Sequence, residues 1–336
     1  MSKTFIIAEI GVNHNNNMVL AKKMIKAAKK AGANAVKFQT FKTEDFVTKK
    51  TPKVNYQKKY TNKTSSHFDM IKSFELSEKN HNLIKRFCKK SKITFLSTPY
   101  DIKSAIFLKK LGCNIFKTAS ADIIDLELHT YLAKSKKKVL ISTGMSSMDE
   151  IKACVNLYKK FSNKKYVLLH CVSNYPCSLK SLNLKAITLM KNFFKSDVGY
   201  SDHSIGHEAA ILSVALGASV VEKHFTINKN LPGPDQKTSA TPEEFKKMVE
   251  EIRKAELILG KSKKECQKEE IQMSNVSRKS LTLVKELRKG EVIMKKHLRL
   301  KRPGTGIYFS EIKNILGKKS KKNLKINYQI KHQDFK

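Results

Sequence analysis

Two short apolar segments of the sequence each end in a histidine, and both have the composition of buried strands. VGYSDHSIG at 198–206 brings Ser201, Asp202 and His203 together, and VVEKHFT at 220–226 ends at His224. Neighbouring strands of a parallel sheet end at the same edge, so we expect the two imidazoles to lie close together. They could hold one divalent ion with positions left open for substrate and water. The alternative is a pair of structural histidines.

A repeated pattern of apolar strand, polar turn and amphipathic helix would position these groups. Helical patterns such as 18–32, which Gly32 ends, separate the apolar strands. Near-continuous apolar strands alternating with helices predict an α/β protein with a covered parallel sheet, and eight units over about 250 residues predict a closed (β/α)8 TIM barrel. A doubly wound sheet is the alternative. The expected strands are 4–10, 34–40, 93–98, 114–120, 138–143, 166–171, 196–202 and 219–225.

The carboxyl ends of these strands carry polar side chains, where the active sites of such barrels lie. A single serine or threonine could simply cap the next helix. Polar groups at every strand end instead predict one shared site. In chain order the ends offer Glu9, Lys37 with Gln39, Ser97 with Thr98, Lys117 with Ser120, Ser142 with Thr143, His170 with Ser173, Ser201 with His203, and Glu222 with His224.

Two of these residue types suggest chemistry directly. Lys37 and Lys117, with hydroxyls around them, provide the point charges and short donors that a phosphate or carboxylate needs. Each lysine could instead pair with a neighbouring carboxylate. Glu9, beside the turn at 13–15, is a candidate acid or base because burial raises the pKa of a carboxyl group. Its alternative role is to accept hydrogen bonds from loop amides.

The formal net charge of +38 suggests a nucleic-acid partner, but the residue types argue against one. Only six of the 67 basic residues are arginine, whereas nucleic-acid surfaces rely on the bidentate guanidinium. Lysines are scattered along the chain, as the codon usage of an AT-rich genome produces. We therefore expect no nucleic-acid partner, and a surface field that attracts small anionic substrates.

The sequence shows no recognisable secretory signal, and its cysteines are not spaced as in disulfide-rich secreted proteins. Both observations predict a cytoplasmic protein. The apolar stretch at 5–12 is interrupted by Glu9 and is too short for a secretory signal or a spanning helix, so no membrane partner is expected. The cysteines at 88, 113, 154, 171, 177 and 266 show no CxxC spacing and are interpreted as reduced core thiols.

Ten short motifs are spread along nearly the whole chain. They are FIIAEIGVNHNNN, AVKFQTFK, FLSTPYD, FKTASAD, ISTGMSSMDEI, LLHCVSNYP, VGYSDHSIG, VVEKHFT, LPGPDQKTSATPEEF and LKRPGTGI. In order and in spacing they resemble the motifs of the bacterial sialic acid synthase family. The resemblance implies a (β/α)8 TIM barrel followed by a small C-terminal SAF (antifreeze-like) domain. It also implies condensation of phosphoenolpyruvate with an N-acylmannosamine-type sugar to give a nine-carbon 2-keto acid and phosphate.

The resemblance also implies roles for individual residues. His203 and His224 would bind a divalent metal ion, Mn2+ or Mg2+ in the family, although imidazole ligands alone would favour zinc or iron. Arg302 matches an arginine that the small domain sends into the other subunit's site, which implies a homodimer. The residues expected to bind phosphoenolpyruvate are Lys37, Thr98, Lys117, Ser120, Ser142, Ser173 and Ser201. Those expected to contact the sugar are Gln39, Asp122, Tyr175 and Asp235.

Asp122 departs from the glutamate of many bacterial members, which leaves its sugar contact open. In the implied mechanism, C3 of phosphoenolpyruvate attacks the open-chain aldehyde of the sugar, which the metal polarises. Glu9 transfers protons to the alkoxide and from the water that attacks C2, and phosphate leaves by C–O cleavage. Lys37 and Lys117 stabilise the negative charge.

The chain is expected to divide into a catalytic barrel at 1–262, a linker at 263–277 and the SAF domain at 278–336. The linker is expected because 261–276 is highly charged with few apolar positions. The lysine-rich segment 49–66 is either a solvated loop or a lid over the sugar.

Alternatives remain for the function. N-acetylmannosamine would give N-acetylneuraminate, whereas a 2,4-diacetamido-2,4,6-trideoxymannose would give N,N'-diacetyllegionaminate; LPGPD at 231–235 makes a pseudaminate synthase less favoured. Another phosphoenolpyruvate-condensing synthase, acting on a sugar phosphate, would need additional basic residues and does not account for the tail. A non-enzymatic carbohydrate-binding or nucleic-acid-associated scaffold would leave the polar strand ends unexplained.

Overall fold

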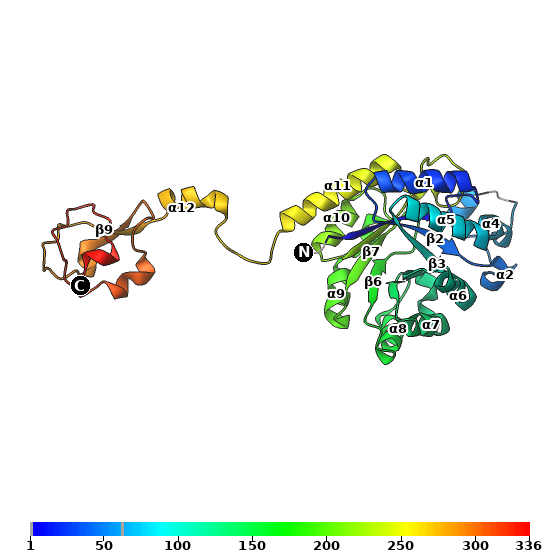
Figure 1. Cartoon of the computed structure of the whole chain (residues 1–336), viewed down its shortest axis with the longest axis horizontal. Helices are drawn as coiled ribbons and strands as arrows, with labels where there is room; N and C mark the ends of the chain where they lie inside the picture. The colour runs from blue at the N-terminus through cyan, green and yellow to red at the C-terminus, as the bar shows by residue number, and fades with distance from the viewer. Residues whose placement is uncertain (1–2, 62–63) are drawn as a thin grey trace. The chain divides into compact units, whose positions relative to one another are not determined.

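The computed structural model of the protein describes residues 3–61 and 64–336. The chain forms two compact units, Met1–Gly260 and Lys261–Lys336, which Figure 1 draws from blue to yellow and from yellow to red. The division falls at Gly260, whereas the sequence placed the end of the barrel at 262. Each unit is described by itself.

The first unit is a closed barrel of parallel strands, which confirms the expected (β/α)8 fold and excludes the doubly wound sheet. Closure comes from pairing of the first strand with the eighth, where Phe5 lies opposite Val220 and Glu9 opposite His224. The expected strand bounds differ from the observed ones by at most two residues. The strands are β1 (Phe5–Gly11), β2 (Ala35–Thr40), β3 (Thr94–Pro99), β4 (Ile115–Thr118), β5 (Lys138–Ser142), β6 (Tyr166–Cys171), β7 (Val198–Asp202) and β8 (Val220–His224).

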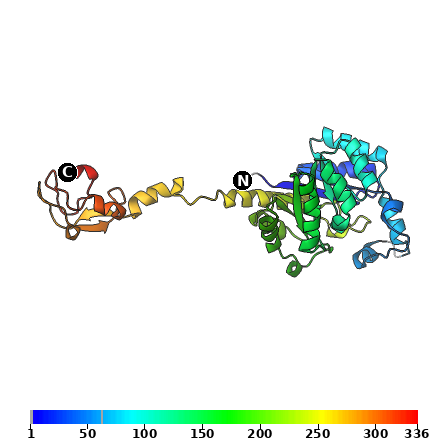
Figure 2. The same cartoon turned by 90° about the horizontal axis from the view of Figure 1, so that it is seen from below.

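Helices surround the strands of this unit, as the two views in Figures 1 and 2 show. Several begin at residues with capping side chains: Ser147 and Thr241 each form a capping box with the glutamate three residues later. The helices are α1 (Met18–Lys30), α2 (Thr43–Phe46), α3 (Asn55–Tyr60), α4 (His67–Phe74), α5 (Glu78–Lys90), α6 (Ile102–Lys110), α7 (Leu126–Lys134), α8 (Met148–Lys160), α9 (Lys185–Phe194), α10 (Glu208–Ala215) and α11 (Pro242–Leu259), with 3-10 turns η1 (Ser120–Ile124), η2 (Leu179–Ser181) and η3 (Gln236–Thr238).

Successive side chains along each strand point to opposite sides of the barrel wall, and this produces two apolar layers. Side chains such as Ile7, Leu140 and Leu169 fill the barrel interior, whereas Ile6 and Ala8 belong to the cluster that includes the surrounding helices. Because side chains alternate with a period of two, Glu9 lies on the same side of β1 as Ile7. The polar strand ends thus continue the interior layers at the carboxyl mouth of the barrel.

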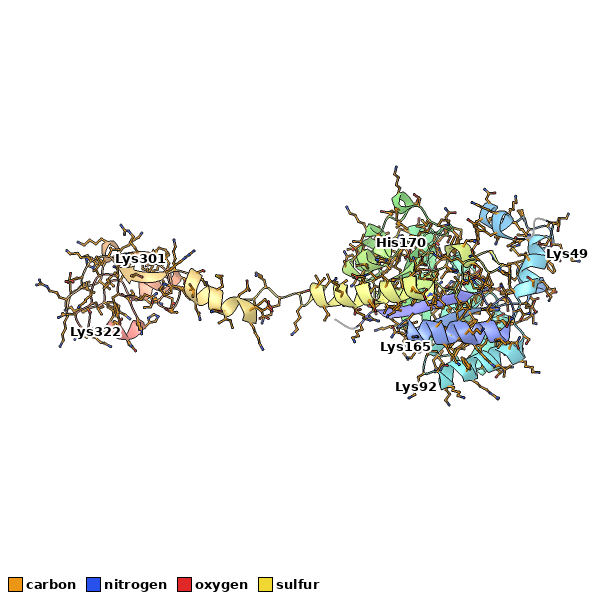
Figure 3. The ribbon with its side chains drawn as sticks, turned by 90° about the horizontal axis from the view of Figure 1, so that it is seen from above. Lys49, Lys92, Lys165, His170, Lys301 and Lys322 are labelled. Carbon is orange, nitrogen blue, oxygen red and sulfur yellow. The ribbon has the colours of Figure 1, made fainter. Side chains whose placement is uncertain are left out.

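The cysteines are all free, and all but Cys266 are buried, which agrees with the interpretation as reduced core thiols for the other five. No helix in the described part of the chain is long and apolar enough to cross a membrane. The labelled side chains of Lys49, Lys92 and Lys165 in Figure 3 are exposed and come from separate segments of the first unit, as expected for scattered lysines.

The second unit contains the antiparallel strands β9 (Ser280–Leu283) and β10 (Leu298–Lys301). Its own apolar core includes Leu281, Leu283 and Ile330. The expected linker at 263–277 is shorter than predicted, because η4 (Lys268–Glu270) and α12 (Ile271–Ser277) form in its second half, and the Gly304 N–H donates to the Asn275 carbonyl at 2.7 Å. The remaining turns are η5 (Lys295–His297), η6 (Phe309–Asn314) and η7 (His332–Asp334).

Candidate active site

A cavity of about 290 Å³ opens at the carboxyl ends of the barrel strands. All of the predicted site residues except Asp122 and Arg302 line it, so the polar strand ends converge as expected. The lining residues among them are Glu9, Lys37, Gln39, Thr98, Lys117, Ser120, Ser142, Ser173, Tyr175, Ser201, His203, His224 and Asp235.

Two buried lysines and two buried carboxylates form the floor of the cavity. The Nζ atom of Lys37 lies 2.9 Å from Oε1 of Glu9 and donates to Oγ1 of Thr98 at 3.0 Å. Oε1 of Glu222 lies 3.4 Å from Nζ of Lys117 and 3.9 Å from Nζ of Lys37, and it accepts a hydrogen bond from Ser201 at 3.1 Å. The lysines therefore do pair with barrel carboxylates, and they do so within the cavity, facing any ligand that enters.

Strand register explains why these four side chains meet. Glu9 is the direct neighbour of Lys37 across β1 and β2, and Ser201 is the neighbour of Glu222 across β7 and β8. Each pair shares a pleat and faces the interior. The sequence places Glu222 at a strand end but assigns it no role, because a sequence does not show which lysines a carboxylate will reach.

The two carboxylates differ in protonation. Burial raises the pKa of Glu9 from its ordinary value of 4.5 to about 7, although Lys37 opposes the shift. Burial acts on Glu222 in the same direction, but Lys117 and Lys37 outweigh it and hold the pKa of Glu222 below its ordinary value. A pair of acids with separated pKa values is the pattern of a proton-transfer group beside a permanently charged one. Glu9 fits the first role and Glu222 the second.

Hydroxyl groups on the other side of the cavity form a linked set. Ser120 donates to the Ser142 hydroxyl at 2.9 Å and accepts from the Gly144 N–H at 3.1 Å. A Cβ atom at Gly144 would overlap the hydroxyl oxygens of both Ser173 and Ser120, so the absence of a side chain lets the backbone approach them. Together with the lysines, these hydroxyls can surround an oxyanion with donors.

The two histidines are arranged in a way that fits a shared metal ion. Nδ1 of His203 donates to the Val172 carbonyl at 2.8 Å, which leaves the lone pair on Nε2, 3.0 Å from the hydroxyl of Tyr175. The ring centroids of His203 and His224 are 5.6 Å apart. Nδ1 of His224 is buried without a hydrogen-bond partner in the described residues, and Oδ2 of Asp235 lies 3.9 Å from it.

The protein would thus supply two imidazole ligands. Within residues 3–61 and 64–336, no cluster of three or more His, Cys, Asp or Glu side chains is poised to hold a metal. Substrate and water would have to complete the coordination sphere, as in catalytic sites that keep open positions.

The alternating direction of side chains along β7 also explains which polar residues of the VGYSDHSIG segment reach the cavity. Ser201 and His203 face the cavity, whereas the buried Asp202 faces away and lies 2.5 Å from Nζ of Lys223. His170, labelled in Figure 3, likewise does not line the cavity, because its ring bonds the Leu182 carbonyl at 2.7 Å. Ser97 bonds Thr40 at 2.6 Å instead of facing the site.

Asp122 and Arg302 are the predicted site residues that the cavity does not include. Asp122 lies on η1, next to the cavity-lining Ala121, and burial raises its pKa to about 7. Arg302 belongs to the second unit, where it lines a separate hollow with Lys301 and Lys331. The roles expected for Asp122 and Arg302 stay predictions.

Cys171 does not line the cavity, but it contacts one of the two histidines from behind, which the sequence did not indicate. Its Sγ atom lies 3.6 Å from Nδ1 of His203, and although burial opposes ionisation, the His203 ring lowers the pKa of this thiol to about 6. The apolar run LLHC gave no sign of this, because the histidine comes from a different strand. Within the segment 49–66, Tyr56 on α3 lines the cavity, 5.3 Å from the Tyr175 ring. That the segment acts as a lid over the sugar stays a prediction. Residues 62–63 of this segment lie outside the described residues.

Comparison with known proteins places this geometry in a family. The chain matches the NeuB family model over residues 24–264 and the SAF domain model over residues 278–336. It is 43% identical to N,N'-diacetyllegionaminic acid synthase from Legionella pneumophila, over 95% of this chain and 91% of the relative. It is 35% identical to pseudaminic acid synthase from Campylobacter jejuni, over 99% of this chain and 97% of that protein.

A solved structure supports the same assignment. The N-acetylneuraminic acid synthetase of Leptospira borgpetersenii, crystallised with citrate, superposes with a TM-score of 0.73 at 36% identity, covering 81% of this chain and 90% of that one. The chain therefore belongs to the NeuB family of sialic acid synthase-like enzymes, with a C-terminal SAF domain.

Proposed function

We propose that the protein condenses phosphoenolpyruvate with 2,4-diacetamido-2,4,6-trideoxymannose and water, giving N,N'-diacetyllegionaminate and phosphate. N-acetylmannosamine, giving N-acetylneuraminate, is the second candidate and was the first expectation from the sequence. The order of the candidates is supported by the 43% identity to the legionaminic acid synthase of L. pneumophila, against 36% to the N-acetylneuraminic acid synthetase of L. borgpetersenii.

The observation that carries the enzymatic proposal is the pair of buried lysines beside the hydroxyl set. Lys37 and Lys117 are each about 95% buried yet line the cavity, and burial of an ammonium group is unfavourable unless anions compensate it. Glu9 and Glu222 compensate part of this charge. A phosphate and a carboxylate on one small molecule would add charge-assisted hydrogen bonds from both lysines and from the serines.

The chain's own residues account for the proton transfers. C3 of phosphoenolpyruvate bonds to the aldehyde carbon of the sugar, and the aldehyde oxygen takes a proton from Glu9, which is about half protonated near pH 7. The Glu9 carboxylate then accepts a proton from the water that adds to C2. The C2–O bond of the tetrahedral intermediate breaks and phosphate leaves, while Lys37 and Lys117 stabilise the charge on its oxygens.

A divalent cation, Mn2+ or Mg2+, is part of the proposal. His203 and His224 would hold it, and when bound it would polarise the sugar aldehyde as a Lewis acid. The orphaned Nδ1 of His224 and the available Nε2 of His203 are consistent with this assignment.

We also propose a homodimer in which Arg302 reaches the barrel of the partner subunit, and a cytoplasmic location. The dimer and the location rest on the family resemblance. The position of Arg302 beside Lys301 and Lys331 gives the second unit a cationic hollow suited to an anionic substrate.

The test is phosphate release from phosphoenolpyruvate with each purified sugar in turn, in the presence of Mn2+. The diacetamido sugar should give the largest kcat/KM, and oxygen-18 in the bridging position should leave with phosphate. Lys117→Met should abolish turnover, while the exposed Lys165→Met serves as a matched control and should not. Absence of phosphate release with every sugar would overturn the proposal.

A further inference from the structure

One face of α4 lines the cavity, and this face was not assigned any role by the motifs. His67, Met70, Ile71 and Phe74 all contact the cavity, and they are spaced i, i+3, i+4 and i+7. On an α-helix these positions lie on one face, about 10 Å long from first to last. The helix therefore presents a continuous stripe to the ligand, with an imidazole at its start and apolar side chains beyond it.

The apolar part of this stripe is distinct from the barrel core. Met70 and Phe74 form a small buried cluster with Val12, against which Ile71 packs, and this cluster is separate from both barrel layers. Small separate clusters are common beneath loops, so the functional meaning of this one rests on the cavity that it lines. The same cavity contains the charged and hydroxyl groups of the strand ends, together with aromatic side chains such as Tyr100 and Tyr175.

The polar start of the stripe lacks a partner. Nδ1 of His67 is buried with no hydrogen bond to any residue of the described chain, 3–61 and 64–336. A buried ring nitrogen without a partner is unfavourable, so a ligand group that bonds to it gains affinity and selectivity.

The stripe also lies away from the hydroxyl set. Val12 follows β1, whereas Ser120, Ser142 and Ser173 follow or end β4, β5 and β6. In a closed barrel of eight strands, β5 is opposite β1. With phosphoenolpyruvate bound by the serines, the α4 side of the cavity is left for the uncharged sugar.

From these observations we infer that the α4 stripe, defined as His67, Met70, Ile71 and Phe74, selects the sugar by binding its C4 acetamido group and its C6 methyl group. This rests on the proposed function. An acetamido group combines an amide, which can bond to His67, with a methyl group, which can pack on Met70, Ile71 and Phe74. N-acetylmannosamine carries hydroxyls at C4 and C6 instead. It lacks the acetyl methyl group that would pack on the stripe, and its C6 hydroxyl would face apolar side chains without a partner.

The expected selectivity follows from the chemistry of the stripe. An apolar pocket discriminates against an added hydroxyl by up to about 100-fold in kcat/KM. Loss of one hydrogen bond that leaves a buried partner unsatisfied corresponds to about ten-fold or more. The wild-type protein should therefore prefer the diacetamido sugar over N-acetylmannosamine by about 10- to 100-fold.

The test measures kcat/KM for both sugars in three variants. His67→Ala should lower the ratio of diacetamido sugar to N-acetylmannosamine about ten-fold, and His67→Gln, which keeps a side-chain donor, should recover part of it. Ile71→Thr introduces a hydroxyl into the apolar stripe and should also lower the ratio. Ser73→Ala, on the exposed face of the same helix, is the control and should leave the ratio unchanged.

The outcomes separate the inference from the proposed function. If the wild type turns over sugars but His67→Ala and Ile71→Thr lower kcat/KM equally for both, the α4 stripe does not select the sugar, although the synthase assignment stands. If the wild type turns over no sugar, the proposed function itself fails. The KM for phosphoenolpyruvate, measured in every variant, checks that the barrel is intact: it should equal that of the wild type.

Discussion

Glu222→Gln is the substitution that most directly tests how the anion site is built. The change keeps the shape of the side chain but removes the charge that compensates Lys117 at 3.4 Å and Lys37 at 3.9 Å. With an effective dielectric constant of about 20, these attractions correspond to about 5 and about 4 kcal/mol. The substitution also removes the cost of burying the Glu222 charge, and this gain offsets part of the lost attraction. The free energy of unfolding should fall by about 3–5 kcal/mol at pH 7.

Phosphate should restore part of that loss. In the wild type, phosphate at about 100 times its dissociation constant stabilises the barrel by about 2.7 kcal/mol. In Glu222→Gln the lysines lack their carboxylate, and the repulsion between Glu222 and the anion is gone. If binding tightens about ten-fold, the same phosphate concentration should give about 4 kcal/mol.

The assay is urea unfolding with and without phosphate, followed by far-ultraviolet circular dichroism, because nearly all long helices belong to the barrel. Glu251→Gln, which removes the half-buried partner of the exposed Lys247 on α11, is the control and should leave unfolding nearly unchanged. The reasoning is refuted if phosphate stabilises Glu222→Gln no more than it stabilises the wild type.

Four further results are expected. Glu9→Gln should bind phosphoenolpyruvate with nearly wild-type affinity and lose turnover; full activity would exclude Glu9 from proton transfer. In the wild type, kcat/KM should decline as the pH rises through about 7, because Glu9 then loses the proton it donates, and Glu222→Gln should move this decline to lower pH, since Glu222 raises the pKa of Glu9. His224→Ala should lose its response to Mn2+, and unchanged inhibition by EDTA would place the metal elsewhere. Mixing Glu9→Gln chains with Arg302→Ala chains, each inactive alone, should restore up to about a quarter of wild-type activity if the arginine acts across a dimer; no recovery despite exchange of subunits would argue against it.

The barrel was predictable because its signals are local. Each strand is a short apolar run bounded by turns, and the periodicity of the intervening helices differs from that of the strands. Strand ends could therefore be located within two residues, and the side facing the cavity follows from alternation once the first polar group is placed. The linker was less predictable, since α12 is short, polar in composition and held by a contact to Gly304 that is distant in sequence.

The parts of the site that escaped the sequence depend on distances between elements. Glu222 becomes important only because two lysines from β2 and β4 reach it, and Cys171 only because His203 lies beside it. His170 shows the reverse error: it ends a strand as expected, but it faces outward. The α4 stripe lies just after the lysine-rich segment 49–66 and belongs to none of the strand ends that the sequence marks.

Gly144 limits the space available beside the hydroxyls that would bind the anion. The smallest added side chain, a methyl group, would overlap the Ser173 hydroxyl oxygen and lie 2.7 Å from the Ser120 hydroxyl oxygen, so both hydroxyls would have to rotate away. Ser120 would then lose its hydrogen bonds with Ser142 and with the backbone N–H of residue 144. Alanine at this position should therefore leave the barrel folded but weaken the oxyanion site, even though Gly144 has no functional group of its own.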